Sequence, residues 1–173
     1  MISPPFTVRP ITTVTDTQLH GLADVLVDCV AGGASVSFML PLSRETALAF
    51  WRKVAADTAR GARELIIAED STGLIGTVQV ILDQPENQPH RADISKMLVH
   101  RRARRMGVGE TLMRAAEDAA RKTGKTVLVL DTASPEADRL YTRLGWKLAG
   151  TIPDYALLPG GGLCDTRYYW RRL

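Results

Sequence analysis

Arg104-Arg105-Met106-Gly107-Val108-Gly109 is the stretch of this sequence that decides the fold. It lies between a predicted strand that ends at Val99 and a predicted helix that begins at about Val108. Glycine lets the backbone turn tightly and brings its N–H groups close to an anion, and a helix that begins there points the positive end of its dipole at the same spot. The stretch therefore predicts a binding site for a pyrophosphate, in which a side chain at Gly109 would stand against the phosphates.

Two better-known phosphate loops fit this stretch poorly. It lacks the Gly-Lys-Ser/Thr ending of an ATP-binding P-loop, and its strand comes late in the chain and is predicted to be antiparallel, unlike the first strand of a dinucleotide fold. A further interpretation stays open, in which the glycines only shape a turn and the arginines at 101, 102, 104 and 105 form a solvated surface.

Strand and helix patterns alternate on both sides of this loop. Before it, the chain predicts strands at 6–11, 65–68, 74–82 and 91–99, and helices from 16 to the glycine pair at 32–33 and from 43 to about 60. After it, the chain predicts a helix at about 108–122, an apolar parallel strand at 126–130, a short helix at 134–144, and strands at 146–150 and 167–170. The order β-α-α-β-β-β-α-β-α-β-β predicts an α/β fold in one domain over residues 1–173, with a mixed, mostly antiparallel sheet and helices on both faces.

The composition excludes several classes of protein. With 173 residues, 45% of them hydrophobic, the chain is the size of one globular domain, and its net charge of +3 is small for a nucleic-acid binder. We expect no secretory signal at the start, no membrane span and a cytoplasmic location. Cys29 and Cys164 are too few for a disulfide framework and are expected to be buried or half-buried thiols, and neither they nor the three histidines have the spacing of a metal site.

Two motifs together resemble a known family. Arg-x-x-Gly-x-Gly at Arg104–Gly109, followed by Leu140-Tyr141-Thr142-Arg143-Leu144-Gly145-Trp146, is similar to the acetyl-CoA signature of the GNAT superfamily of N-acetyltransferases. The order of strands and helices matches the fold of that superfamily along the whole chain. The resemblance implies an enzyme that uses acetyl-CoA as cosubstrate and no metal. Ser134 is a departure, because many relatives carry there an asparagine that helps to hold the cofactor.

A narrower resemblance points to the tabtoxin-resistance acetyltransferases within this superfamily. The resembling stretches are Gly32-Gly33-Ala34-Ser35-Val36, Phe38-Met39, Arg91-Ala92-Asp93, Lys96-Met97-Leu98-Val99, Leu130-Asp131-Thr132 and Pro153-x-Tyr155. They imply a small, amino-acid-like amine as the acceptor, and a role in resistance to a toxin or antibiotic. A monomer and a homodimer both remain open.

The resemblance also implies where acetyl-CoA binds. Its pantetheine arm would add like a strand to the backbone of Met97, Leu98 and Val99. Its pyrophosphate would lie on the amides of Arg105, Gly107, Val108 and Gly109, Arg104 and Arg105 would compensate its charge, and Thr111 would add a hydroxyl.

Three side chains are candidates for catalysis. Tyr141 matches the position that in relatives protonates the coenzyme A sulfur, although a core aromatic at the same place remains an alternative. Asp93 and Asp131, on two strands that flank the site in this fold, are expected to hold or deprotonate the acceptor amine. Because an aspartate ordinarily has a pKa of ~3.9, either one would act as a base only with help from burial or water. The alternatives are a surface partner of Arg91 for Asp93 and a turn-forming cap for Asp131.

The acceptor pocket is expected between two loops. The fold places the loop at 32–39 and the loop around Tyr155 beside it, so Ser35, Ser37, Phe38 and Tyr155 are the candidate contacts, the hydroxyls among them for a carboxylate or amide of the substrate.

Other functions compete with acetylation of a small molecule. A nucleic-acid module would use the arginine run, but no aromatic ladder accompanies it. A protein-lysine or peptide acetyltransferase, or a non-catalytic regulator that binds coenzyme A, would carry the same cofactor motif.

Overall fold

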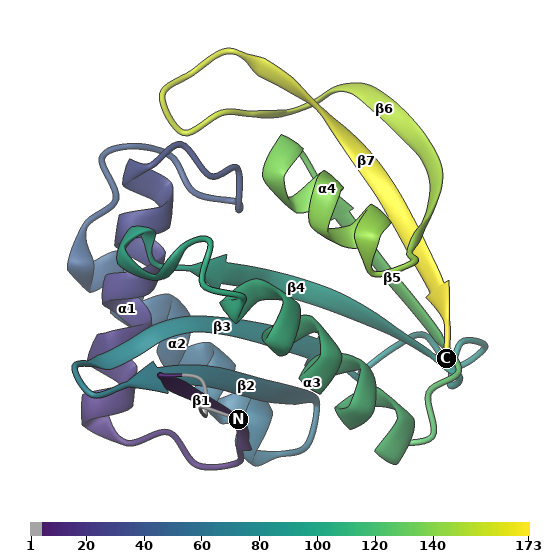
Figure 1. Cartoon of the computed structure of the whole chain (residues 1–173), viewed down its shortest axis with the longest axis horizontal. Coiled ribbons are helices and arrows are strands. Elements are labelled where there is room, and N and C mark those ends of the chain that lie inside the picture. The colour runs from purple at the N-terminus through teal and green to yellow at the C-terminus, as the bar shows by residue number, and fades with distance from the viewer. Residues whose placement is uncertain (1–4) are drawn as a thin grey trace.

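The computed structural model describes residues 5–173, which form a seven-stranded mixed sheet with helices on both faces (Figure 1). The elements are β1 (Phe6–Ile11), α1 (Asp16–Ala31), α2 (Arg44–Ala59), β2 (Arg63–Asp70), β3 (Gly73–Ile81), β4 (Arg91–Val99), a 3₁₀ turn (Arg101–Ala103), α3 (Val108–Lys122), β5 (Val127–Thr132), α4 (Pro135–Arg143), β6 (Lys147–Leu157) and β7 (Leu163–Arg172). The predicted fold class and element order are confirmed, with the 3₁₀ turn added between β4 and α3.

The sheet has the strand order β1-β2-β3-β4-β5-β7-β6. All neighbouring strands are antiparallel except β4 and β5. These two run parallel, and α3 lies in the connection that crosses from one to the other. Their pairing covers only Arg91 to Asp93 on β4, opposite Val127 to Val129 on β5. Beyond Asp93 the two strands separate, so the sheet opens in its middle.

The core has one apolar layer on each face of the sheet. One layer joins α1 and α2 to the strands and contains the fully buried Trp51, Leu22 and Leu65. The other joins α3 to the opposite face through Leu112 and Met113 and continues under α4 to Tyr141. In Figure 1, α3 and α4 lie in front of the sheet and α1 and α2 lie behind its first strands. Each fully buried large apolar side chain contributes about 1.5–3 kcal/mol relative to exposure.

Local sequence signals fix where the helices begin. Thr15 and Gln18 form a reciprocal capping box at the start of α1, and Ser43 caps α2 by accepting the Thr46 N–H at 3.1 Å. Ser134 caps α4 by accepting the Ala137 N–H at 3.2 Å. Each such cap is worth about 1 kcal/mol.

The predicted bounds of the last two strands were wrong. β6 and β7 extend well beyond the predicted 146–150 and 167–170, so Tyr155 lies on β6 and not in a loop. Nearly every residue of β6 is exposed, and its pairing with β7 is interrupted between Leu148 and Gly150 and again between Ile152 and Ala156. A strand without a buried face has no apolar alternation to read from sequence. Within residues 5–173, no helix combines the length and the apolar character needed to cross a membrane.

Candidate active site

The loop before α3 presents free backbone N–H groups. Gly107 is the N-terminal cap of α3, with a φ of +83° that favours glycine, and no side chain caps the helix there. The N–H of Thr111 donates to the Gly107 carbonyl at 3.1 Å, so the amides of the three preceding residues have no partner within the helix. A Cβ built on Gly107 would have no atom within 4 Å. The loop therefore offers open space and N–H donors where an anion was predicted.

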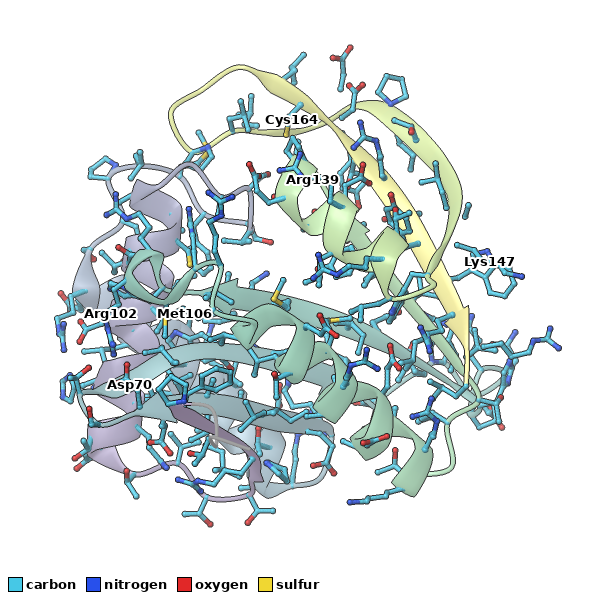
Figure 2. The ribbon with its side chains drawn as sticks, in the orientation of Figure 1. Asp70, Arg102, Met106, Arg139, Lys147 and Cys164 are labelled. Atoms are coloured by element: carbon cyan, nitrogen blue, oxygen red, sulfur yellow. The ribbon has the colours of Figure 1, made fainter. Side chains whose placement is uncertain are left out.

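The arginines of this loop divide into two pairs. Arg101 donates from Nε to Asp28 at 2.8 Å, and Arg102 forms an ion pair with Asp70 (Figure 2). Within the described residues, neither Arg104 nor Arg105 has a carboxylate in ion-pairing distance, and Arg105 has a φ of +63°. The positive charge left at the loop therefore comes from Arg104 and Arg105, the two residues predicted to compensate a pyrophosphate.

Two details of the predicted loop contacts need correction. A Cβ on Gly109 would lie 3.2 Å from Leu140 Cδ2 and 3.8 Å from Met97 Sδ, so a side chain there would point between α3 and α4 and not at the phosphates. The Thr111 hydroxyl donates to the Gly107 carbonyl at 3.1 Å, so its oxygen is left only as an acceptor while that bond holds.

The separation of β4 from β5 leaves an open strand edge. Among the residues that the structure describes, none pairs with residues 94–99 on the β5 side, while Leu98 and Val99 still pair with Thr77 and Gly76 of β3. Met97, Leu98 and Val99, the predicted pantetheine contacts, lie on this edge. An extended chain with amide groups can bind there as an added strand.

Tyr141 lies inside the protein beside this opening. The residue is 5% exposed, and its ring centre is 6.1 Å from that of Trp146 and 5.9 Å from that of Tyr169. Burial raises the pKa of the Tyr141 phenol, and the nearby charge of Asp131 raises it further. No residue among those described forms a hydrogen bond with its hydroxyl, so the proton is held at neutral pH and is not engaged elsewhere.

A pocket of about 250 Å³ lies beyond the end of β5. It contains five of the six residues predicted to bind the acceptor, from three separate segments: Ser35, Ser37 and Phe38 of the α1–α2 connection, Asp131 of β5, and Tyr155 of β6. Cys164 and Thr166 of β7 also line it. In Figure 2 the labelled Cys164 lies on the β6–β7 hairpin, near the start of β7. Cys29 is buried and Cys164 half-buried, as expected for both thiols.

Asp131 is the predicted carboxylate that lines the pocket. The buried Thr166 hydroxyl donates to its Oδ2 at 2.8 Å, which fixes one oxygen and leaves the other free to accept. The charge of Asp131 also contributes to the raised pKa of the Tyr141 phenol.

Asp93 does not line the pocket. It forms an ion pair with Arg91 and accepts from Gln84 Nε2 at 3.3 Å, and its side chain is 38% exposed. This position agrees with the alternative weighed from the sequence, a surface partner of Arg91. The charges of Asp131 and Asp93 still both reach Tyr168, whose pKa rises to about 12, first through its 2.9 Å hydrogen bond with Tyr155 and then through burial.

Three polar residues near the pocket were missed from the sequence. Thr166 and Tyr168 belong to a strand whose extent was underestimated, and Lys96 has the appearance of an ordinary solvent-facing lysine. Lys96 stands in a stretch that resembles the tabtoxin-resistance enzymes but was given no role there, because only the path of β4 turns it toward the Ser37 hydroxyl.

Known proteins share both the sequence pattern and the fold. The model of the acetyltransferase (GNAT) family matches residues 35–146. An uncharacterized N-acetyltransferase of Azospirillum brasilense, from the hisH-hisA intergenic region, is 30% identical over 127 residues, which cover 72% of this chain and 74% of that protein. The chain belongs to the GNAT acetyltransferase family.

Solved structures of other GNAT proteins share its fold. A phosphinothricin acetyltransferase from Sinorhizobium meliloti, in complex with acetyl-CoA, has a TM-score of 0.81 at 19% identity, with 98% of this chain and 89% of that chain covered. A ribosomal-protein-alanine N-acetyltransferase from Brucella melitensis has a TM-score of 0.78 at 22% identity, with 96% and 99% covered. The resemblance to the GNAT superfamily is thus confirmed, and the narrower one to the tabtoxin-resistance enzymes stays a prediction.

Proposed function

We propose that this GNAT enzyme transfers the acetyl group of acetyl-CoA to the amine of a small, amino-acid-like acceptor. Membership of the family establishes an N-acetyltransferase with acetyl-CoA as its cosubstrate. The observation that carries the acceptor class is the pocket of about 250 Å³, a size suited to a small molecule, whose lining combines hydroxyl side chains with the carboxylate of Asp131. We also propose that residues 1–173 act as a single catalytic domain.

The loop and the open strand edge fit acetyl-CoA. The amides before Thr111, with Arg104 and Arg105, would hold the pyrophosphate, and the backbone of Met97, Leu98 and Val99 would pair with the pantetheine amides. Gly107 supports this placement, because its φ of +83° is a conformation that side chains rarely adopt and the space beside its Cα is open for a ligand.

Transfer forms a bond from the amine nitrogen to the thioester carbonyl carbon and breaks the bond from that carbon to sulfur. The protein must hold the amine, donate hydrogen bonds to the oxyanion and protonate the departing thiolate. Tyr141 is the proton donor in this proposal, since burial raises its pKa and its hydroxyl is not otherwise engaged. A backbone N–H on the open edge of β4 would serve the oxyanion.

Asp131 is the residue that receives the acceptor amine in this proposal. Its position on the pocket wall, with one oxygen held by Thr166, suits a carboxylate that orients an ammonium or accepts its proton through water. Asp93 has a longer-range part in this proposal, because its carboxylate is paired with Arg91 and its charge only contributes to the raised pKa of Tyr168.

Detoxification of an amino-acid-like compound is the biological role that this acceptor suggests. The Sinorhizobium meliloti relative is named for acetylation of phosphinothricin, which supports a small acceptor in this fold. The narrower sequence resemblance to tabtoxin-resistance enzymes supports the same class.

Acetylation of a protein or peptide amine is the second candidate. The Brucella melitensis structure carries the name of such an activity, and large apolar side chains are exposed close to the pocket, among them Met39, Tyr155 and Leu157. A peptide could lie across these side chains while its amine entered the pocket.

A thiol-release assay with acetyl-CoA separates these candidates. The acceptors are amino acids, polyamines, aminoglycosides and a lysine peptide, each at one concentration and pH. We expect turnover with amino-acid-like acceptors. Turnover with the peptide alone would favour the second candidate, and saturable acetyl-CoA binding without turnover of any acceptor would favour a non-catalytic regulator.

A further inference from the structure

Lys96 occupies an irregular position on β4. In the pairing with β3, Thr77 lies opposite Leu98 and Gln79 lies opposite Ser95, so Lys96 and Met97 together face a single residue. This is a β-bulge, and Lys96 within it has a φ of +50°, which is uncommon for a residue other than glycine. A bulge re-aims the side chain it carries, and here it turns Lys96 toward the α1–α2 connection.

The ammonium of Lys96 is only partly satisfied by the protein. It donates to Ser37 Oγ at 3.2 Å and lies 5.8 Å from the centre of the Phe50 ring. No carboxylate among residues 5–173 lies within ion-pairing distance of it, although a lysine ammonium has three N–H donors. Burial lowers the pKa of Lys96, while the more distant charge of Asp131 acts in the opposite direction. A half-buried cation of this kind is stabilised when a bound anion completes its shell.

Ser37, the partner of Lys96, lines the same pocket as Asp131. The pocket thus has two carboxylates in its lining, Asp131 and Asp165, and, behind the Ser37 hydroxyl, a cation with free donors. An acceptor with an amine and an acidic group would match both signs of charge at once, whereas a polyamine would leave the Lys96 ammonium without a counter-charge.

We infer that Lys96, together with Ser37, binds the carboxylate of the acceptor and so selects amino acids over amines that lack an acidic group. The inference rests on the proposed function, in which Asp131 receives the amine of the same molecule. It assigns Lys96 as a specificity-determining residue, with no part in the proton transfers.

Matched acceptor pairs test this role. Each pair is an amino acid that the enzyme acetylates and the carboxamide of the same amino acid, which keeps the amine and loses the negative charge. In the wild type we expect a higher kcat/KM for the acid. Lys96→Met should raise the KM for the acid about 10- to 100-fold, with kcat little changed, and should leave the carboxamide unaffected. Lys96→Arg should retain part of the preference.

Lys147→Met is the matched control. Lys147 also lies over an aromatic ring, 5.2 Å from the centre of Trp170, but on the part of β6 opposite Trp170, whereas the pocket residue Cys164 pairs at the other end of the hairpin. Figure 2 shows the labelled Lys147 and Cys164 well apart along the hairpin. We expect Lys147→Met to leave the kinetics of both acceptors unchanged.

Several results would overturn the inference. A wild type that treats acid and carboxamide alike, or a Lys96→Met variant that loses the same rate on both, would assign Lys96 a structural or proton-transfer role. Should Lys96→Met not fold, Lys96→Gln gives the same comparison without the charge. Failure of the proposed function looks different, because the wild type would then acetylate neither member of any pair.

Discussion

The phosphate loop and the acceptor pocket differ in how the chain builds them. The loop takes its N–H donors from one continuous stretch, residues 104–109, whose shape depends on a single glycine conformation at Gly107. The pocket takes its side chains from segments far apart in the chain, as the contact between Cys164 and Ser35, 129 positions apart, illustrates. The loop can therefore keep one ligand through large changes of sequence, because backbone groups do the binding, whereas single substitutions in the pocket can change the acceptor.

The largest expected effect lies between the two regions, at Tyr141. Tyr141→Phe keeps the ring in the core and removes only the hydroxyl, so we expect kcat to fall about 10²-fold with acetyl-CoA affinity nearly unchanged. Steady-state kinetics and calorimetry measure the two quantities.

Tyr169→Phe is the matched control for that substitution. The Tyr169 ring packs 5.9 Å from Tyr141, but its hydroxyl donates to Asp138. We expect about 1 kcal/mol of lost stability and a kcat close to that of the wild type. Equal kcat values for Tyr141→Phe and the wild type would leave Tyr141 as a core residue only.

The loop should respond through cofactor affinity. Gly109→Val would force Leu140 and Met97 aside, because its Cβ would begin 3.2 Å from Leu140 Cδ2. We expect acetyl-CoA to bind at least about tenfold more weakly, which corresponds to about 1.4 kcal/mol. Unchanged affinity in calorimetry, with circular dichroism like that of the wild type, would place the cofactor elsewhere.

The phosphate loop and the acceptor pocket also differ in how much of each could be predicted from the sequence. Helix α3, Val108–Lys122, was predicted at its observed bounds because Gly107 and Gly124 flank it with local signals, and β4, Arg91–Val99, was predicted as well. The loop at residues 104–109 was predicted from the same kind of local signal, its glycines and the helix that begins after them. Strand β6 was underestimated because its exposed faces carry no alternation and its pairing with β7 is interrupted twice.

The pocket was only partly predictable for the same reason. Ser35, Asp131 and Tyr155 were placed there through the family resemblance, and all three line the one pocket. Lys96 belongs to a resembling stretch but was given no role, since the bulge that re-aims it arises from pairing with β3. Asp93 was expected to share the role of Asp131. Arg91, two positions earlier in the sequence, had already suggested the alternative of a surface ion pair, and the structure contains that pair.

The two aspartates should therefore separate in their effect on the acceptor. Asp131→Asn removes the charge of the carboxylate that is proposed to hold the amine, so we expect the acceptor KM to rise several-fold to about tenfold, with a smaller change for Asp93→Asn. If Asp131 acts as the base, kcat will fall as well, and the acidic limb of the pH profile of kcat will move. A larger effect of Asp93→Asn, in variants that melt near the wild type, would contradict this assignment.

The smallest effect is expected at Asp70, which anchors Arg102 away from the ligand. Hydrogen bonds from Arg102, and then from Thr72, lower the pKa of the Asp70 carboxyl in the folded protein despite its burial. Because the pKa of Asp70 is lower in the folded protein, its ionised carboxylate stabilises the fold at every pH above the unfolded pKa of ~3.9. This contribution to stability is lost as the pH falls toward the pKa of the folded protein. Asp70→Asn should thus cost at most about 1 kcal/mol at pH 7 and less in acid, measured by urea unfolding. A loss of acetyl-CoA affinity in this variant would show that Arg102 acts on the ligand after all.

Filling the pocket tests most directly whether it is the acceptor site. Ser35→Trp places a large ring among the lining residues, and Gly150→Trp adds the same ring to β6 where a Cβ would meet nothing within 4 Å. The measurement is acetyl transfer to the best small acceptor, with acetyl-CoA affinity determined on the same preparations. We predict that Ser35→Trp loses transfer while binding acetyl-CoA like the wild type, and that Gly150→Trp retains both. Undiminished transfer by a folded Ser35→Trp enzyme would contradict the assignment of this pocket to the acceptor.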